Sequence, residues 1–291
     1  MATRRLLISY AHPDDESFGL GGLIARYVAE GVEVYLICAT NGECGTVSPE
    51  HLNGYSSVAE LRLAELDCAA EKLGLKRVYK LGYRDSGMMG SETSLHPDCL
   101  WQADQAEVTR RVVEVMREVR PQVVITFNRY GGYGHPDHIA IQRATTTAFS
   151  AAGSPEYDTG QEPYRPQKLY YSGIDSGFLR FAITIMKLRG KDPRRLGRNA
   201  DIDLQAVLDN VEPVHARVRV RDYYEAWDEA SNCHASQLGG GAPRLPLFLR
   251  KLLSPYQGFT RVFPAPPANR VDEYDLFAGV TADEAELDRV R

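Results

Sequence analysis

The amino-acid sequence predicts an α/β fold, with a Rossmann-like, mostly parallel sheet, helices on both faces and a C-terminal elaboration. Two observations carry this prediction. Short apolar strand segments alternate with helical segments through residues 1–152. The strand segments are continuous apolar runs, which is typical of strands that are covered on both faces. We place a soft boundary there and expect residues 153–291 to pack on the core.

The predicted elements follow one another without long gaps. Residues 19–31 form a helix ended by Gly31, and Pro121 stops a helix over 103–120. The predicted strands of the core are 4–11, 32–39, 75–81 and 122–127, and its other helices are 56–74 and 136–151. Beyond the core we expect strands at 168–172 and 214–220, helices at 221–238 and 246–253, and chain breaks at 239–243 and 264–267.

The composition is that of an ordinary globular protein. Of the 291 residues, 43% are hydrophobic and 25% are charged, and the net charge is -5. These values do not favour a nucleic-acid or anionic-membrane surface. One basic segment, read as a solvated face, contains Lys187, Arg189, Lys191, Arg194, Arg195 and Arg198.

No apolar stretch approaches the roughly 20 residues of a membrane span, and the N-terminal apolar run is read as a buried strand, not a signal peptide. The five cysteines are scattered without a CxxC pattern. We therefore expect neither a disulfide framework nor a cysteine zinc site, and a cytoplasmic location is the default.

The first chemistry-bearing segment is residues 11–16 (AHPDDE), between the first predicted strand and the first predicted helix. Ligands of parallel sheets bind at the carboxyl ends of the strands. His12 and Asp15 can meet at one metal ion, which leaves Asp14 free to act as a base. The alternative is a polar turn in which Asp14 or Asp15 caps the helix. Three successive acids repel one another, and a cap does not require that cost.

The second segment is residues 131–138 (GGYGHPDH), which follows the strand at 122–127 and opens a helix. Its glycines allow a tight backbone turn, and Pro136 suits the first helical turn. His135 and His138 are three residues apart, so both can face one site. The alternative is that Asp137 or a histidine caps the helix, but two His-Pro-Asp turns at two strand ends make that explanation poor.

Together the two segments supply His12, Asp15 and His138 with an open fourth position, which is the pattern of a catalytic zinc site. A neighbouring carboxylate, for which Asp14 is suited, can move the proton of an activated water. His135, if protonated, or Tyr133 could donate to the developing oxyanion. Two other classes compete. A non-haem Fe(II) oxygenase uses similar ligands but usually a β-barrel, and Gly19-Leu20-Gly21-Gly22 is a poor match to a nucleotide-binding loop.

These motifs resemble those of the zinc-dependent LmbE-like (PIG-L) de-N-acetylases. The resemblance extends to residues 40–43 (TNGE), 62–66 (RLAEL), 83–88 (YRDSGM) and 234–237 (HASQ), strongly through about residue 150 and weakly after it. It implies hydrolysis of an N-acetyl amide on a small glucosaminyl conjugate, or of a thiol-conjugate amide, with residues 153–291 completing the substrate site. A homo-oligomer is compatible with these features. The implied site contains zinc (Fe(II) can share the ligands) at His12, Asp15 and His138, Asp14 as general base, His135 as acid or electrostatic partner, and Tyr133 near the oxyanion.

The resemblance also implies that Arg62 reaches a substrate head group and that Asp85 binds a sugar hydroxyl. The alternatives are a surface Arg62 paired with Glu65, and an Asp85 that only shapes a turn before Gly87. His234 is predicted with equal weight as a site residue or a packed histidine. His51, His96 and His215 are treated as non-catalytic, and the motif His96-Pro97-Asp98 as a coincidence because no strand precedes it.

Overall fold

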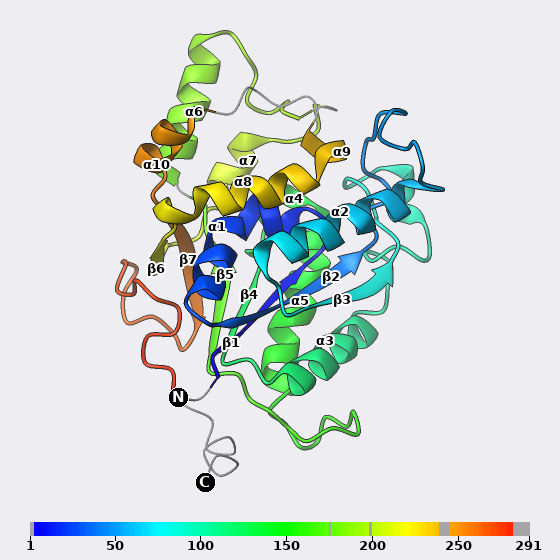
Figure 1. Cartoon of the computed structure of the whole chain (residues 1–291), viewed down its shortest axis with the longest axis vertical. Coiled ribbons are helices and arrows are strands. Elements are labelled where there is room, and N and C mark those ends of the chain that lie inside the picture. The colour runs from blue at the N-terminus through cyan, green and yellow to red at the C-terminus, as the bar shows by residue number, and fades with distance from the viewer. Residues whose placement is uncertain (1–2, 175, 198–199, 239–244, 282–291) are drawn as a thin grey trace.

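The protein, as a computed structural model, is built on one seven-stranded sheet with strand order β3-β2-β1-β4-β5-β7-β6 (Figure 1). The structure describes residues 3–174, 176–197, 200–238 and 245–281. The strands are β1 (Arg5–Tyr10), β2 (Glu33–Thr40), β3 (Arg77–Tyr83), β4 (Val123–Thr126), β5 (Lys168–Ser172), β6 (Ala216–Arg219) and β7 (Tyr256–Phe263).

The strands from β3 to β5 in that order run parallel, and β1 lies at the centre of them. Ile8 of β1 pairs with Leu36 of β2 on one side and with Ile125 of β4 on the other, and none of Leu6, Leu7 and Ile8 is exposed. Continuous burial of this kind requires cover on both faces. The predicted mostly parallel α/β sheet is therefore confirmed.

Two helical layers provide that cover (Figure 1). Helices α1 (Asp15–Ala29), α2 (Val58–Leu73) and α8 (Tyr224–Cys233) pack against one another, and α3 (Gln105–Val119) packs against α5 (Pro136–Ala151). The remaining helical segments are η1 (Glu92–Leu95), α4 (Gly131–Gly134), α6 (Ser176–Leu188), α7 (Leu204–Asp209), η2 (Arg221–Tyr223), α9 (Ala235–Leu238) and α10 (Leu247–Leu253).

The glycines early in α1 serve helix packing. Gly21 and Gly22 face Trp227 of α8, and a Cβ atom on Gly22 would lie 2.8 Å from the indole. The two helices can approach this closely only where side chains are absent. This contact gives the Gly-rich segment a packing role in place of the nucleotide-binding role weighed above.

Several predicted boundaries are wrong. Helix α1 begins at Asp15, four residues before the predicted start, because Asp15 and Glu16 suit the first turn of a helix. The single helix predicted over 221–238 is divided into η2, α8 and α9. Three elements were not predicted from the sequence, namely α6, α7 and β7, the last of which runs antiparallel between β5 and β6. The predicted break at 239–243 lies outside the described residues.

The expectation of no disulfide is also wrong. Cys68 of α2 and Cys233 at the end of α8 form a disulfide, with Cα atoms 5.8 Å apart and a sequence separation of 165. Such a pair carries no spacing signal, because only the packing of α2 against α8 brings the two cysteines together. Among the described residues, Cys38, Cys44 and Cys99 are free.

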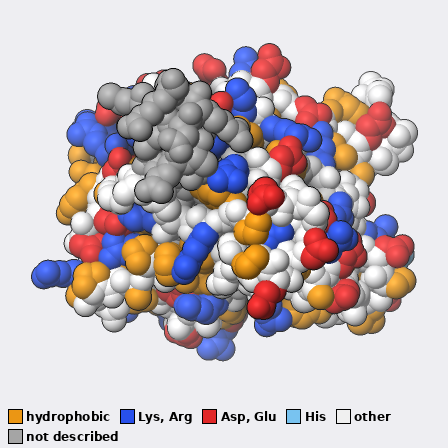
Figure 2. Space-filling model, turned by 90° about the horizontal axis from the view of Figure 1, so that it is seen from below, with side chains coloured by type: hydrophobic (Ala, Val, Ile, Leu, Met, Phe, Trp, Pro, Cys, Tyr) orange, Lys and Arg blue, Asp and Glu red, His pale blue; other side chains and the backbone are white. Residues whose placement is uncertain are grey.

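Basic and acidic side chains are interspersed over the face shown in Figure 2. Lys187, Arg189, Arg194 and Arg195 of the basic segment are exposed, in keeping with a solvated face, and Arg198 lies outside the described residues. Lys191 is exposed as well, but it lines the large cavity described below. No helix in the described part of the chain has the length and apolar character needed to cross a membrane.

Candidate metal centre and active site

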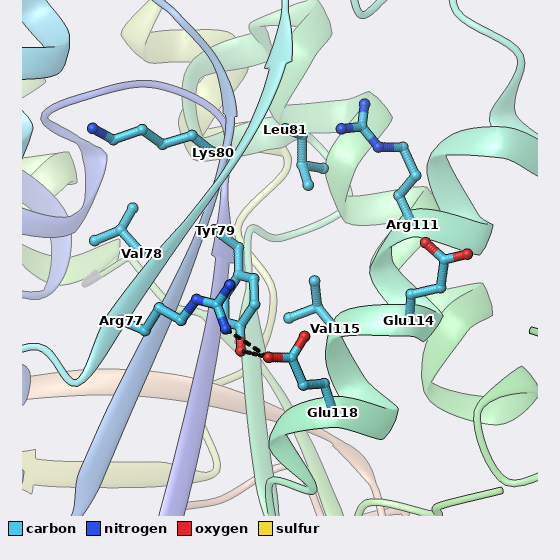
Figure 3. Close-up of a pocket in the computed structure, with 9 residues that line it drawn as sticks. All are labelled: Arg77, Val78, Tyr79, Lys80, Leu81, Arg111, Glu114, Val115 and Glu118. Atoms are coloured by element: carbon cyan, nitrogen blue, oxygen red, sulfur yellow. Dashed lines mark hydrogen bonds and ion pairs between the residues drawn. The ribbon is translucent and has the colours of Figure 1, made fainter. Parts of the chain in front are cut away.

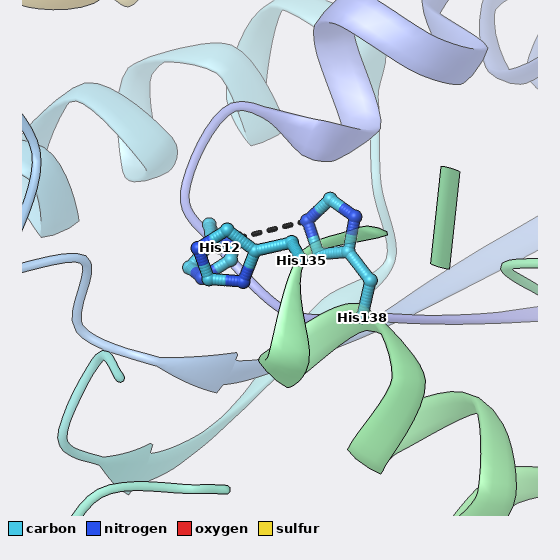
Figure 4. A group of neighbouring side chains, drawn as sticks. All are labelled: His12, His135 and His138. Carbon is cyan, nitrogen blue, oxygen red and sulfur yellow. Dashed lines mark hydrogen bonds between the residues drawn. The ribbon is translucent and has the colours of Figure 1, made fainter. Parts of the chain in front are cut away.

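The two His-Pro-Asp turns meet because their strands are neighbours. The segment with His12 follows β1, and the segment with His135 and His138 follows β4, which pairs with β1 in parallel. Both turns therefore emerge at the same edge of the sheet. Figure 4 shows the three imidazole rings converging, with a contact between His12 and His138.

The three predicted metal ligands lie at the separations that a tetrahedral ion requires. Nδ1 of His12 lies 3.1 Å from Nε2 of His138. The Asp15 carboxylate lies 3.4 Å from Nδ1 of His12 through Oδ2 and 3.4 Å from Nε2 of His138 through Oδ1. Zinc bonds of about 2.0–2.2 Å in tetrahedral geometry place ligand atoms about 3.3 Å apart. The donor set fits zinc, and it would fit Fe(II) by the same chemistry.

Other donors lie close to the same point. His12, His135 and His138 can bring one ring nitrogen each within 4.8 Å of one another, as can donor atoms of the group His12, Asp85, His135 and Asp137. We favour Asp15 over His135 as the third ligand because its oxygens lie 3.4 Å from Nδ1 of His12 and 3.4 Å from Nε2 of His138. In addition, Nδ1 of His135 already accepts a hydrogen bond from the backbone N–H of Asp137.

Local structure fixes the orientation of each ligand. Nδ1 of His138 lies 3.1 Å from the carbonyl of Gly131, so this nitrogen carries the proton and Nε2 is free for a metal. Gly131 and Gly132 both have positive φ, and the backbone N–H of Gly132 donates to Asn128 Oδ1 at 2.8 Å. Asp15 is held by the backbone N–H of His12 at 2.7 Å.

Asp137, which from the sequence was only a candidate helix cap, lies directly behind His12. It is fully buried, and its Oδ2 lies 3.1 Å from Nε2 of His12. Both the backbone N–H, at 2.9 Å, and the hydroxyl of Ser86 donate to it. A carboxylate behind a ligating imidazole fixes the tautomer and raises its basicity. The mirrored HPD motif was the available signal for it.

Charge interactions dominate the ionisation of this cluster. Burial lowers the pKa of His12, but Asp85, Asp137 and Asp15 outweigh burial, and its pKa is raised well above the usual value. Burial likewise raises the pKa of Asp15, but His138 and His12 hold it well below the usual value. The carboxylate is therefore ionised and ready to bind a cation.

Asp14 precedes the proposed ligand Asp15 in the chain and lines the cavity. Its backbone has φ 126°, a conformation that favours glycine, and its side chain makes no capping hydrogen bond to α1. Oδ2 of Asp14 accepts from Nη2 of Arg62 at 2.8 Å. Burial raises the pKa of Asp14 to about 6 against the opposing effect of Arg62. A carboxyl group with a pKa near the working pH suits a general base.

His135 and Tyr133 line the same cavity. Burial, reinforced by His12 and His138, lowers the pKa of His135 well below the usual value, so the ring is neutral. Since Nδ1 accepts a backbone hydrogen bond, the proton lies on Nε2. The protonated form of His135 considered from the sequence is therefore not the form that the structure favours. Burial also raises the pKa of Tyr133, which keeps its hydroxyl a donor.

Arg62 is buried and does not pair with Glu65, so the surface alternative is wrong. Its guanidinium donates to the carbonyls of Pro13 at 2.5 Å and Gly42 at 2.9 Å as well as to Asp14. Arg62 lines the cavity, and its contact with a substrate head group stays a prediction.

Asp85 makes the predicted turn contact, and its binding of a sugar hydroxyl stays a prediction. Oδ1 accepts from the backbone N–H of Gly87 at 2.8 Å, which is the turn contact, and the side chain also lines the cavity. Burial raises its pKa, but His12 beside it lowers the pKa well below the usual value. Asp85 is therefore an ionised acceptor, as binding a sugar hydroxyl would require.

The cavity has a volume of about 1170 Å³. Segments from both halves of the chain line it, and the C-terminal half contributes Lys191, Leu196, Gly197, Asp201, Ile202 and Gln237. A separate hollow of about 320 Å³ lies between β3 and α3 and shares no residue with this site (Figure 3). Glu118 there binds Arg77 at 2.6 Å and Tyr79 at 3.0 Å.

The remaining histidines differ in burial, and none of them lines the cavity. His234 is fully buried, and its Nε2 lies 2.7 Å from Oε1 of Glu16. Burial lowers the pKa of His234, but Glu16 raises it by more. His96 and Asp98 of the third His-Pro-Asp motif have side-chain exposures of 43% and 82%, which agrees with coincidence. His51 and His215 lie outside the residues that line the cavity.

Known proteins share both the sequence and the fold. The family model PIG-L, GlcNAc-PI de-N-acetylase, matches residues 7–149. The "1D-myo-inositol 2-acetamido-2-deoxy-alpha-D-glucopyranoside deacetylase" of Thermobispora bispora is 40% identical over 248 residues, covering 82% of this chain and 80% of the relative. The protein of the same name from Thermobifida fusca is 35% identical, covering 96% of this chain and 100% of the relative.

Among solved structures, N,N'-diacetylchitobiose deacetylase from Pyrococcus horikoshii has a TM-score of 0.60 at 21% identity, covering 97% of this chain and 88% of that one. A conserved protein from Thermus thermophilus has a TM-score of 0.58 at 22% identity, covering 92% and 98%. These two likenesses concern the fold, whereas the identity to the deacetylases spans most of the sequence. The chain therefore belongs to the PIG-L, or LmbE-like, family, which its two His-Pro-Asp motifs predicted.

Proposed function

We propose that this protein is a metal-dependent deacetylase that hydrolyses the N-acetyl amide of a glucosaminyl inositol. The geometry of His12, Asp15 and His138, with Asp14 beside them at the wall of the cavity, is the observation that carries the proposal. The names of the relatives from Thermobispora bispora and Thermobifida fusca supply the substrate class.

The donor set of two imidazoles and one carboxylate suits a catalytic zinc ion with an open position. Zinc, when bound there, supplies a Lewis acid that polarises a carbonyl group and lowers the pKa of a water molecule to about 7. Asp137 and the carbonyl of Gly131 keep His12 and His138 in the tautomers that leave one ring nitrogen of each free for the ion.

Asp14 is the proton carrier of this proposal. Its carboxylate takes a proton from water as the water oxygen bonds to the acetyl carbon, and it passes that proton to the amide nitrogen as the C–N bond breaks. The products are acetate and the free amine. Arg62 fixes the carboxylate through Nη2 and lowers its pKa, so the group stays ionised at neutral pH.

His135 and Tyr133 are the candidates for stabilising the oxyanion. A neutral His135 offers the N–H at Nε2, and Tyr133 offers its hydroxyl. Donors that are fixed before the reaction stabilise the negative charge that develops on the carbonyl oxygen. In this assignment, His135 acts by hydrogen bonding and not as a charged acid.

The substrate's sugar would lie between the metal ligands and the cavity wall at Asp85. An ionised carboxylate binds a pair of hydroxyl groups as an acceptor. Such contacts orient the acetamide as well as add affinity, because a misplacement of about 1 Å can cost about 100-fold in rate.

The test is amine release by the zinc-loaded, iron-loaded and metal-free protein. We expect the glucosaminyl inositol to be cleaved faster than free N-acetylglucosamine, and a simple N-acetyl amino acid to be cleaved least. The reaction should consume no oxygen. Fastest cleavage of the amino acid, or of a thiol-conjugate amide, would assign another amide to the same site. Full activity without any metal would refute the proposal.

A further inference from the structure

Glu16 is a buried acid that the reaction above does not use. It follows the proposed metal ligand Asp15 and is fully buried, as is its partner His234. Oε1 of Glu16 lies 2.7 Å from Nε2 of His234 and accepts from the Ser17 hydroxyl at 2.6 Å. A carboxylate with no access to water needs such partners to remain in place.

The second carboxylate oxygen of Glu16 binds the backbone of Asp14, the proposed general base. Oε2 accepts from the backbone N–H of Asp14 at 3.1 Å. Asp14 is one of the few residues other than glycine with a positive φ among those described. A backbone in this region persists only when surrounding contacts hold it. The Glu16 carboxylate holds the N–H side of Asp14, and Arg62 holds the side chain and the carbonyl of Pro13.

We propose that His234 and Glu16 are positioning residues that hold the Asp14 backbone in its strained conformation and thereby aim its carboxylate into the cavity. The expected effect on kcat rests on the proposed function, whereas the expected effect on the Asp14 backbone does not. His234 is fully buried and is not among the residues that line the cavity, so it acts through Glu16 and does not touch substrate.

The His234 ring has one hydrogen-bond partner among the described residues, which is Glu16. Its Nδ1 is buried without a hydrogen-bond partner in the described part of the chain, so Glu16 is the partner of the ring. Phe18 packs edge-on against the ring at a centroid distance of 5.7 Å. The imidazole is therefore held with the N–H of Nε2 aimed at Glu16.

Helix α2 holds the segment around His234 in place through contacts on both sides of that residue. Cys233, the residue before His234, is joined to Cys68 of α2 by the disulfide. Two residues after His234, the backbone N–H and the hydroxyl of Ser236 donate to Glu65 of α2 at 2.8 and 2.7 Å. Arg62 lies one turn before Glu65 on the same helix. One helix thus supports both contacts that orient Asp14.

The experiment compares His234→Leu, which removes the donor, with His234→Gln, which keeps an N–H near the position of Nε2. We expect His234→Leu to lower kcat by roughly 10–100-fold, the usual effect of losing a partner behind a catalytic group. KM and zinc content should change little, and His234→Gln should recover most of the loss. Recovery by a donor separates positioning from simple packing.

Leucine leaves the Glu16 charge unpaired and can prevent folding. The double variant Glu16→Leu/His234→Leu removes that charge together with the oxygen that accepts the Asp14 N–H, and we expect it to fold, to bind zinc and to remain slow. A crystal structure of this variant gives a readout that does not depend on activity, namely φ at Asp14. We expect φ to relax toward negative values and the Asp14 contact with Arg62 to lengthen.

His215→Leu is the matched control, because His215 is also buried and accepts a backbone N–H, from Arg261 at 3.1 Å. It should lower the melting temperature without changing kcat. An unchanged φ at Asp14 in the double variant, or equal loss of kcat in both His234 single variants, would overturn the positioning role. Absence of deacetylase activity in the wild-type protein would instead refute the proposed function and leave the crystallographic test standing.

Discussion

The same tripeptide, His-Pro-Asp, follows β1 and β4, but its aspartate lies in a different environment in each case. After β1, the aspartate is Asp14, which has a strained backbone and faces the cavity. After β4, the aspartate is Asp137, which is fully buried behind His12 and held by Ser86. In the proposed mechanism, one turn presents a carboxylate for proton transfer, and the other uses its carboxylate to orient a metal ligand.

The difference comes from what surrounds each aspartate. Arg62 and Glu16 pull Asp14 into a conformation outside regular helix geometry. Asp137 lies in the first turn of α5, where the helix itself carries the side chain inward. The third copy, His96-Pro97-Asp98, follows η1 and is exposed. A short motif thus specifies chemistry only where a strand end and a second segment enclose it.

The largest effect should come from removing a ligand. We expect His138→Ala to lose zinc and to fall to the activity of the metal-free protein, because an imidazole nitrogen of the site is gone. His135→Ala is the matched comparison and should keep its zinc, as measured by metal analysis after dialysis. Zinc loss in His135→Ala with zinc retained in an Asp15→Asn variant would assign the third ligand to His135.

Asp14→Asn should keep the metal and lose turnover. The amide cannot accept the proton of water, and loss of a general base typically costs about 10²–10⁴-fold in kcat. Zinc content and melting temperature should stay close to those of the wild-type protein. Near wild-type turnover with zinc bound would remove Asp14 from the mechanism.

Asp137→Asn should have an intermediate effect. The substitution keeps the shape of the side chain but removes the charge behind Nε2 of His12. Loss of such a partner typically lowers metal affinity or activity by about 10–100-fold. A zinc titration followed by kcat measurements would separate the two quantities. Equal losses in Asp14→Asn and Asp137→Asn, both in kcat alone, would contradict the division of labour between the turns.

The pH dependence should report Asp14. Its pKa is raised to about 6, and only the ionised form can accept a proton, so kcat/KM should fall as the pH drops through about 6. Arg62 lowers that pKa, so Arg62→Gln should move the acidic limb to higher pH. The apparent value belongs to the coupled site. A limb that moves to lower pH in Arg62→Gln would argue for another titrating group.

The smallest effect should come from the third motif. Because His96 and Asp98 are exposed and separated by 3.9 Å, His96→Ala should change kcat, KM and zinc content by less than the error of measurement. Zinc analysis alongside His138→Ala gives the contrast directly. A measurable loss of zinc would show that the coincidence was misjudged.

The sequence of the core determined much of this arrangement. Apolar runs such as the one around Ile8 require burial on both faces, and in a parallel sheet this places the ends of neighbouring strands side by side. The convergence of His12 and His138, the proposed metal ligands, could therefore be predicted from two local motifs. Local signals sufficed because each motif is fixed by its own strand and turn.

Only the tertiary structure decided how distant segments support that site. The Cys68–Cys233 disulfide, the contact of His234 with Glu16 and the enclosure of Arg62 join residues far apart in the chain. Strand β7 likewise owes its place to antiparallel pairing with β5 and β6. None of these has a characteristic spacing, because the packing of α2 and α8 and the closing of the sheet set their geometry. The sequence determined the chemical groups at the strand ends, and long-range packing decided which of them faces the cavity and which is buried behind its neighbour.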